Sequence, residues 1–144
     1  MRLDAAEARQ RFASARVARL ATASATARPH IVPIVFALAG NTLYFAVDAK
    51  PKSTTALRRL ANIAENPHVS VLADRYEDDW TQLWWARADG VARLAESDEA
   101  GTAVRLLTKR YPTYAADPPP GPVVAVTVRR WSGWAAASSG VTSS

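Results

Sequence analysis

Residues 29–38, PHIVPIVFAL, form the segment that most constrains the fold of this chain. Successive side chains of a β-strand point to opposite faces of the sheet, so a strand with one face in water carries a polar residue at every second position. Here both alternating sets are apolar apart from His30. We therefore expect a strand that is covered on both sides, as in a closed barrel or at a contact between subunits.

Five other segments have the alternation and the β-branched and aromatic residues typical of strands, and they predict a mainly antiparallel sheet. They span residues 17–23, 42–48, 68–74, 83–95 and 123–131. Gly40 and Asn41 predict a hairpin turn into the third strand, so the first three strands should form a meander. Together with residues 29–38, the expected sheet has six strands.

Three segments with apolar residues at helical spacing predict helices that flank the sheet. They span about residues 4–15, 53–65 and 97–111. Their first turns can be capped by Asp4, by Ser53 or Thr54, and by Ser97 or Asp98. The three prolines within residues 117–121 predict a rigid connection to the last strand.

The chain has 144 residues, which is the size of one domain. We expect residues 1–134 to form that domain and residues 135–144 to be a short tail, disordered in part. The sequence contains no cysteine, which excludes disulfides, thiolate metal sites and cysteine nucleophiles. No apolar run approaches the roughly 18 residues that cross a bilayer, and the first residues lack the apolar core of a signal peptide. A cytoplasmic protein without a membrane partner is the expectation.

The formal net charge is +5 and the sequence pI is about 10.1, so an anionic partner is expected. The charges are segregated. Acidic residues gather within residues 74–79 and 96–99, whereas Lys50, Lys52, Arg58 and Arg59 lie in a central loop and helix. Segregation favours a local anion site over the uniformly basic face of a nucleic-acid binder, so no nucleic-acid partner is expected.

The loop Lys50-Pro51-Lys52-Ser53 leads directly into a predicted helix. Two ammonium groups, a hydroxyl and the free N–H groups of the helix N-terminus can converge there on a phosphate. The alternative is a solvated turn whose lysines only suit the surface. Arg59 lies roughly opposite the apolar stripe of the same helix, so it would need a groove formed by a neighbouring segment to meet a ligand.

Trp84 and Trp85 are consecutive strand residues and must point to opposite faces of the sheet. One ring can fill the core while the other faces a helix, a ligand or a partner subunit; packing in the core or at a subunit contact is the more common use. His30 can hydrogen-bond a cofactor or relay a proton, or it is simply a partly exposed histidine at a strand end. Neither His30 nor His68 has the spacing of a metal site, so no metal is expected.

Several catalytic motifs are missing. The chain has no glycine-rich phosphate loop, no G-x-S-x-G elbow and no H-E-x-x-H pair. Hydrolysis by side chains is therefore unsupported. If the protein is an enzyme, an organic cofactor should supply the reactive centre while the protein supplies binding, orientation and exclusion of water.

Three segments carry a family resemblance: RPHIVPIVFALAGNTLYFAVDAKPK, LRRLANIAENPHVSVLAD and LWWARADGVARL. In this order they resemble the pyridoxamine 5'-phosphate oxidase-like split β-barrel family, and within it the actinobacterial branch proposed to use coenzyme F420. The resemblance implies a six-stranded antiparallel split barrel (FMN-binding split barrel-like) with flanking helices. It also implies a homodimer that binds two cofactors at the subunit interface.

The resemblance also implies which residues contact the cofactor. Those expected along the flavin or deazaflavin ring are His30, Val32, Pro33 and Ile34. Those expected near its phosphate are Lys50, Lys52, Ser53 and Arg59. Trp84 or Trp85 would lie beside the ring of the other protomer. The family's second basic position in this helix is Ala61 here. The substrate-recognition residues of true pyridoxamine phosphate oxidases have no counterpart near the C-terminus, and this second departure argues against the vitamin B6 reaction.

The resulting hypothesis is an F420-dependent oxidoreductase that transfers a hydride between the deazaflavin and a small unsaturated organic substrate. The basic loop and helix of the chain suit the phosphodiester and glutamate tail of F420. One alternative keeps the fold and the reaction class but uses FMN. Another is a non-catalytic F420 carrier, consistent with the absence of an evident acid or base.

Overall fold

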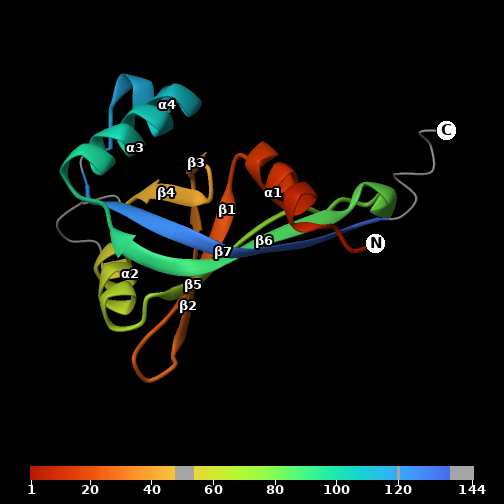
Figure 1. Cartoon of the computed structure of the whole chain (residues 1–144), viewed down its shortest axis with the longest axis horizontal. Coiled ribbons are helices and arrows are strands. Elements are labelled where there is room, and N and C mark those ends of the chain that lie inside the picture. Colours follow the sequence, from red (N-terminus) through yellow and green to blue (C-terminus); the bar gives the residue numbers. More distant parts are fainter. Residues whose placement is uncertain (48–53, 120, 137–144) are drawn as a thin grey trace.

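A computed structural model describes residues 1–47, 54–119 and 121–136, with the backbone alone for residues 54–57. The described helices are α1 (Ala5–Ser14), α2 (Thr54–Glu65), α3 (Ser97–Arg110), α4 (Pro112–Ala116) and the 3-10 turn η1 (Trp80–Gln82). The described strands are β1 (Ala18–Ala23), β2 (Pro29–Ile34), β3 (Ala37–Ala39), β4 (Thr42–Ala46), β5 (His68–Arg75), β6 (Trp84–Leu94) and β7 (Val123–Ala135). They form one antiparallel sheet in the order β2-β1-β5-β6-β7-β4-β3, and β6 and β7 extend beyond its body to η1 (Figure 1).

The sheet curls because its two edge strands are neighbours along the chain. β2 and β3 lie at opposite ends of the strand order, yet Val35 and Phe36 alone separate them. Cα atoms across a trans peptide are about 3.8 Å apart, so Ile34 and Ala37 lie no more than about 11 Å from each other. The two edges therefore converge at this corner, which gives the curled, half-barrel sheet of a split barrel.

The sequence predicted a single strand over residues 29–38 and a meander of the first three strands, and both predictions were wrong. β1 pairs with β2, and β3 pairs with β4, but β2 and β4 are not neighbours in the sheet. The chain bends at Val35 and Phe36 and crosses from one sheet edge to the other. The described sheet accordingly has seven strands where six were expected, and the mainly antiparallel architecture with flanking helices is confirmed.

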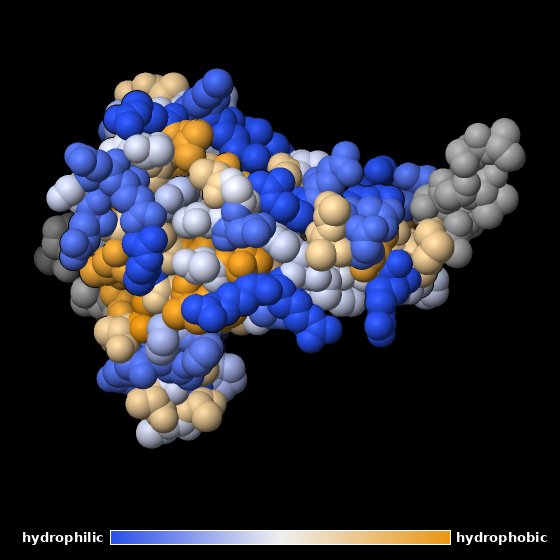
Figure 2. Space-filling model, in the orientation of Figure 1, coloured by the Kyte–Doolittle hydropathy of each residue, from blue (hydrophilic) through white to orange (hydrophobic). Residues whose placement is uncertain are grey.

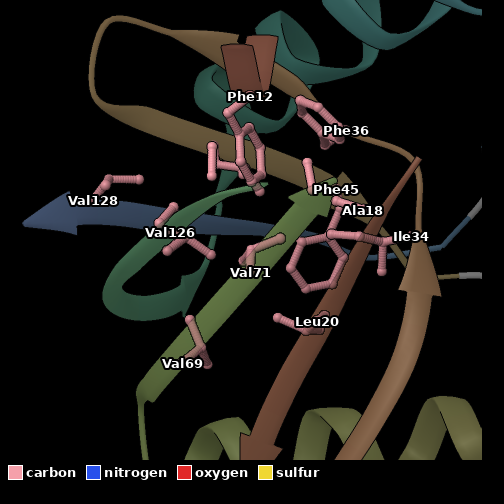
Figure 3. Close-up of a cluster of buried hydrophobic side chains, with 14 of the residues drawn as sticks. Phe12, Ala18, Leu20, Ile34, Phe36, Phe45, Val69, Val71, Val126 and Val128 are labelled. Carbon is pink, nitrogen blue, oxygen red and sulfur yellow. The ribbon is translucent and has the colours of Figure 1, made fainter. Parts of the chain in front are cut away.

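The main core lies inside the curl, where side chains from α1, α2 and the strands meet (Figure 3). Phe12 of α1 is fully buried, with its ring centroid 4.9 Å from that of Phe36 and 5.3 Å from that of Trp131. Fully burying such a side chain contributes roughly 1.5–3 kcal/mol. The cap predicted at Asp4 is confirmed: Asp4 Oδ1 accepts from the Glu7 backbone at 2.8 Å, and the Asp4 backbone donates to Glu7 Oε1 at 3.2 Å.

A second, smaller cluster holds α3 against the other side of the sheet. Ala103 packs there with Tyr44 of β4 and with Ala125 of β7. Glu99 accepts a hydrogen bond from the Tyr44 hydroxyl at 2.9 Å and a bidentate pair from Arg93 at 2.6 and 2.9 Å. α3 therefore covers β3, β4 and the start of β7.

The rest of that outward side of the sheet, on β2, β1, β5 and β6, is half-buried or exposed, and we call it the open face. The register sets its side chains in two rows, Ile31, Ala21, Ser70 and Asp89 in one and Pro33, Arg19, Leu72 and Arg87 in the other. α1 and α2 pack on the opposite side, through Phe12 and Ile63. On the face turned to the viewer, apolar patches lie among hydrophilic side chains (Figure 2).

The C-terminal half differs from expectation in two elements. α4 occupies residues for which no helix was predicted, with Pro112 in its first turn, where the missing N–H of proline costs no helical bond. β7 continues past Trp131 to Ala135, which pairs with Trp84. The strand thus reaches the first residue of the predicted tail; residues 137–144 lie outside the described residues. Across the described ranges, every helix is too short or too polar to traverse a bilayer.

Candidate functional site

The edge strand β2 exposes backbone groups that no other described strand uses. The Ser24 backbone donates to the Arg28 carbonyl at 3.0 Å, and this sets the parity of the β1–β2 ladder. Because paired residues alternate between hydrogen-bonded and non-bonded positions, the carbonyls of Pro29, Ile31 and Pro33 point off the free edge. Both prolines occupy these outward positions, where their missing N–H costs no ladder bond. The free edge therefore offers three acceptors and the Ile31 N–H.

A cavity of about 260 Å³, which we call the corner cavity, lies where β2 turns into β3. It is lined by Val17, Pro33, Ile34, Val35, Ala46, Arg59 and Tyr114. The corner cavity brings together three residues that the sequence singled out, namely Pro33, Ile34 and Arg59. The sequence predicted that Arg59 needs a groove formed by a neighbouring segment to meet a ligand. The β2–β3 corner is that segment.

A second cavity of about 300 Å³, the hairpin cavity, lies at the start of β2. It is lined by Ser24, Arg28, Pro29, His30, Arg58 and Asn62. His30 Nδ1 is buried there without a hydrogen-bond partner among the described residues. The Asn62 amide donates to the Thr22 hydroxyl at 3.1 Å, and this buried bond fixes α2 against β1 beside the cavity.

Positive charge dominates both cavities. Arg28 and Arg58 are exposed, and their guanidinium groups make no hydrogen bond or ion pair with the described part of the chain. Arg59 is half-buried. No carboxylate is among the described lining residues of either cavity. Among the described lining residues, an anion that enters either cavity therefore meets arginine side chains and no carboxylate.

The other predicted residues lie in different places. Lys50, Lys52 and Ser53 fall outside the described residues, so their contact with a phosphate stays a prediction. Val32 packs against the main core and is not among the lining residues of either cavity.

The two tryptophans point to opposite sides of the sheet, as their positions in the strand predicted. Trp84 is 8% exposed and belongs to the main core, with the Arg11 guanidinium 5.9 Å from its ring centroid. Trp85 is half-buried on the outward side, opposite Trp134 of β7. The Arg87 guanidinium lies 5.9 Å from the Trp85 ring centroid. Trp85 is thus the less buried of the two and lies on the outward side of the sheet.

Tyr114 and Arg28 are among the cavity residues that sequence reasoning missed. Tyr114 comes from α4, which has no clear helical pattern in the sequence. Arg28 lies in the β1–β2 turn, where a single basic residue carries no motif. A large pKa shift occurs elsewhere: hydrogen bonds from Arg93 and then Tyr44 lower the pKa of Glu99 from 4.5 to about 2. That carboxylate fastens α3 to the sheet. Among the described residues, no cluster of histidines and acids could hold a metal ion.

The family model of pyridoxamine 5'-phosphate oxidase matches residues 5–135. The chain belongs to this family. The predicted resemblance is thereby confirmed at the level of the pyridoxamine 5'-phosphate oxidase family, while its F420 branch stays a prediction. No curated protein sequence matches the chain.

Solved structures share the fold of this family member at low sequence identity. An FAD-binding protein from Mesorhizobium loti is 22% identical, with a TM-score of 0.70, and the match covers 92% of this chain and 95% of that one. The conserved hypothetical protein Rv2991 from Mycobacterium tuberculosis is 24% identical, with a TM-score of 0.73 and coverages of 96% and 88%. A heme-binding protein from Mycobacterium smegmatis is 21% identical, with a TM-score of 0.70 and coverages of 95% and 60%. These likenesses establish the split-barrel fold.

Proposed function

We propose that this protein is a homodimeric split-barrel oxidoreductase that binds coenzyme F420 and transfers a hydride between the deazaflavin and a small unsaturated organic substrate. The observation that carries the proposal is the group of three arginines, Arg28, Arg58 and Arg59, that lines two cavities along the free edge of β2. Family membership supports a redox role, and the absence of hydrolytic motifs agrees with it.

The described residues suit an anionic ring cofactor. Arg59 and the neighbouring arginines supply charge-assisted hydrogen bonds to a phosphate. The outward carbonyls and the Ile31 N–H of β2 match the donors and acceptors along one edge of a deazaflavin or flavin ring. His30 Nδ1, which is buried and unpartnered among the described residues, has its hydrogen bond free for a ligand atom.

Each part of the site has a separate task in this reaction. When bound, F420 supplies the hydride-transfer centre, so no protein nucleophile is needed. Pro33, Ile34 and Val35 present apolar surface that excludes water from the ring. The arginines hold the anionic part of the cofactor, which fixes the position of the ring relative to the substrate.

The homodimer is proposed from the open face. Ile31 is 66% exposed, and Pro33 beside it is also exposed. Trp85, Leu72 and Val91 are half-buried on the same side of the sheet. Apolar residues in such an arrangement are typical of a subunit contact. A second copy of the protein on this face would cover the outward side of β2, whose sequence predicted a strand covered on both sides. It would also bring the Trp85 of the second copy toward the edge of β2.

FMN is the alternative cofactor, and the FAD-binding protein with the same fold supports a flavin in general. The test is a calorimetric titration of the purified protein with F420, FMN, FAD and hemin in parallel. The proposal expects F420 to bind most tightly. Binding of FMN without F420 would select the alternative, and binding of hemin alone, or of no compound, would overturn the proposal.

A second measurement assigns the anion site. Arg59→Ala and Lys52→Ala should each weaken F420 binding by about 1–3 kcal/mol, because each removes a charge-assisted hydrogen bond to phosphate. Arg105→Ala is the matched control, since Arg105 is exposed on α3 and does not line either cavity. Unchanged affinity in both site variants would contradict the anion site.

Turnover separates the enzyme from a carrier. Reduced F420 bound to the protein is mixed with a panel of enones and quinones, and its reoxidation is followed by absorbance. Reoxidation by at least one compound, faster than in the absence of protein, is expected of the oxidoreductase. Binding without any turnover would favour the carrier.

A further inference from the structure

A third cavity, of about 660 Å³, lies at one end of the open face, and we call it the outer cavity. Its volume is within the roughly 300–1,000 Å³ typical of small-molecule sites. Ala21, Ala23, Val69 and Val91 give it apolar walls. Pro29 lines both the outer cavity and the hairpin cavity, so the two cavities meet at the start of β2.

Two exposed arginines face the outer cavity. Arg129 and Arg130 line it, are exposed, and make no hydrogen bond or ion pair with the described residues. The nearby carboxylate of Asp89 is already engaged. It accepts from the Ser70 hydroxyl at 2.6 Å and forms an ion pair with Arg87 Nε at 3.0 Å. Asp89 therefore does not cancel the positive charge at the cavity.

An irregularity in the sheet brings both arginines to the same cavity. Consecutive residues of a regular strand point to opposite faces, so one of the two would point away. Between Asp89 and Gly90 the pairing of β6 with β7 shifts: Asp89 opposes Arg130, Gly90 opposes Val128, and Arg129 is the extra residue. Bulges of this kind redirect a side chain and are over-represented beside active sites.

Gly90 permits this close approach of the two strands. A Cβ at this position would lie 2.3 Å from the carbonyl oxygen of Thr127, a distance that no side chain tolerates. The bulge and Gly90 together fix the local geometry of β6 and β7 at the outer cavity. The result is a pair of guanidinium groups that lie beside apolar walls and have no hydrogen-bond or ion-pair partner in the described part of the chain.

We infer that the outer cavity binds the substrate and that the substrate is an unsaturated organic acid. Arg129 and Arg130 hold its carboxylate, and the alanine and valine walls contact its apolar body. This inference rests on the proposed function, because it places the substrate at the Pro29 end of the β2 edge, along which the ring is proposed to lie. In the proposed dimer the cavity would be enclosed between subunits, a common position for small-molecule sites.

The test measures binding and does not depend on turnover. The full-length protein is titrated by calorimetry with 3-(2-naphthyl)acrylate and with the corresponding primary amide, in the presence and absence of F420. The two probes share one apolar body and differ in charge. The acid should bind at least about tenfold more tightly than the amide, because the amide cannot form charge-assisted bonds to two guanidinium groups.

Variants then assign the contact. Arg129→Ala and Arg130→Ala should each weaken binding of the acid by roughly tenfold or more and leave binding of the amide unchanged. Arg130→Lys should retain much of the preference for the acid. Arg19→Ala is the matched control, since Arg19 is an exposed arginine of the open face that does not line the outer cavity.

Three results would overturn the inference. They are equal binding of acid and amide, unchanged binding of the acid in both alanine variants, and equally weakened binding of acid and amide in those variants, which would mean that the two arginines shape the cavity and do not contact the carboxylate. Failure of the proposed function has a different signature. In that case F420 would not bind, while the acid would still bind the cofactor-free protein through Arg129 and Arg130.

Discussion

The Tyr111 hydroxyl lies 3.2 Å from the backbone nitrogen of Phe36 and 2.9 Å from the carbonyl oxygen of the same residue. One side chain at the end of α3 thus satisfies both backbone polar groups of the residue at which the chain crosses from one sheet edge to the other. The corner cannot pair these groups with a strand, because β2 has ended and β3 has not begun. The position of the corner cavity therefore depends on Tyr111.

Tyr111→Phe should lower the free energy of unfolding by about 1–3 kcal/mol, since the buried Phe36 N–H would lose its acceptor. Urea denaturation followed by tryptophan fluorescence measures this change. Tyr76→Phe is the control, because Tyr76 is 65% exposed and should show no comparable effect. Equal denaturation midpoints for Tyr111→Phe and the wild type would contradict the assigned role.

Gly90→Ala should destabilise the fold by roughly 1–3 kcal/mol, because the new methyl group would overlap the backbone of Thr127. Gly101→Ala provides a contrast of opposite sign. Gly101 lies inside α3, where an added Cβ would be at an ordinary van der Waals distance of 3.6 Å from Arg105 Nη1. Alanine there should stabilise the protein by about 0.5–1 kcal/mol through helix propensity. Thermal unfolding of the two variants tests both signs, and a neutral Gly90→Ala would be incompatible with the close strand approach.

The stability that Glu99 contributes should depend on pH in a defined window. Hydrogen bonds from Arg93 and Tyr44 lower the pKa of Glu99 from 4.5 to about 2 in the folded protein. A depressed pKa means that the native state favours the charged carboxylate, so this contribution is complete above pH 4.5 and is lost as the pH falls toward 2.

The difference in Tm between the wild type and Glu99→Gln should therefore be largest near neutral pH and shrink across that window. Differential scanning calorimetry at a series of pH values measures it. Asp78→Asn, at an exposed acid of the β5–β6 turn, serves as the control and should not reproduce this profile. A difference that stays constant from pH 7 to 2 would speak against the assigned hydrogen bonds.

Ile31→Glu should dissociate the proposed homodimer, because it puts a charge into the apolar part of the open face. Sedimentation velocity over a range of concentrations reports the state of association. The control is Leu94→Glu, since Leu94 is 52% exposed at the end of β6 and is not part of the open face. A wild-type protein that is monomeric throughout, or an Ile31→Glu variant as dimeric as the wild type, would remove the dimer proposal.

Much of the local structure was predictable because it depends on neighbours in the chain. The cap at Asp4 uses Glu7 three residues later, and the opposite orientations of Trp84 and Trp85 follow from strand geometry alone. The break of residues 29–38 was not predictable in this way. Val35 and Phe36 continue the apolar alternation, and the turn is stabilised by Tyr111, which lies 75 residues further along.

The candidate site, too, was predictable only in part. Pro33, Ile34 and Arg59 were identified from the sequence. The cavity that they share is also lined by Tyr114, which lies on α4, a helix that the sequence did not predict. Arg129 and Arg130 read as two ordinary basic residues of a strand. Their joint orientation depends on the bulge opposite Gly90, which arises from the pairing of β6 with β7.

The sequence by itself determined most of the segments that become helices and strands, which faces are apolar and where positive charge is concentrated, because these properties follow from the spacing of side chains along a regular backbone. The tertiary structure alone decided which strands pair, where the chain crosses between sheet edges and which arginines share a cavity. The physical reason is that strand pairing joins residues far apart in the chain, and the lowest free energy of that pairing depends on the whole core rather than on any one segment.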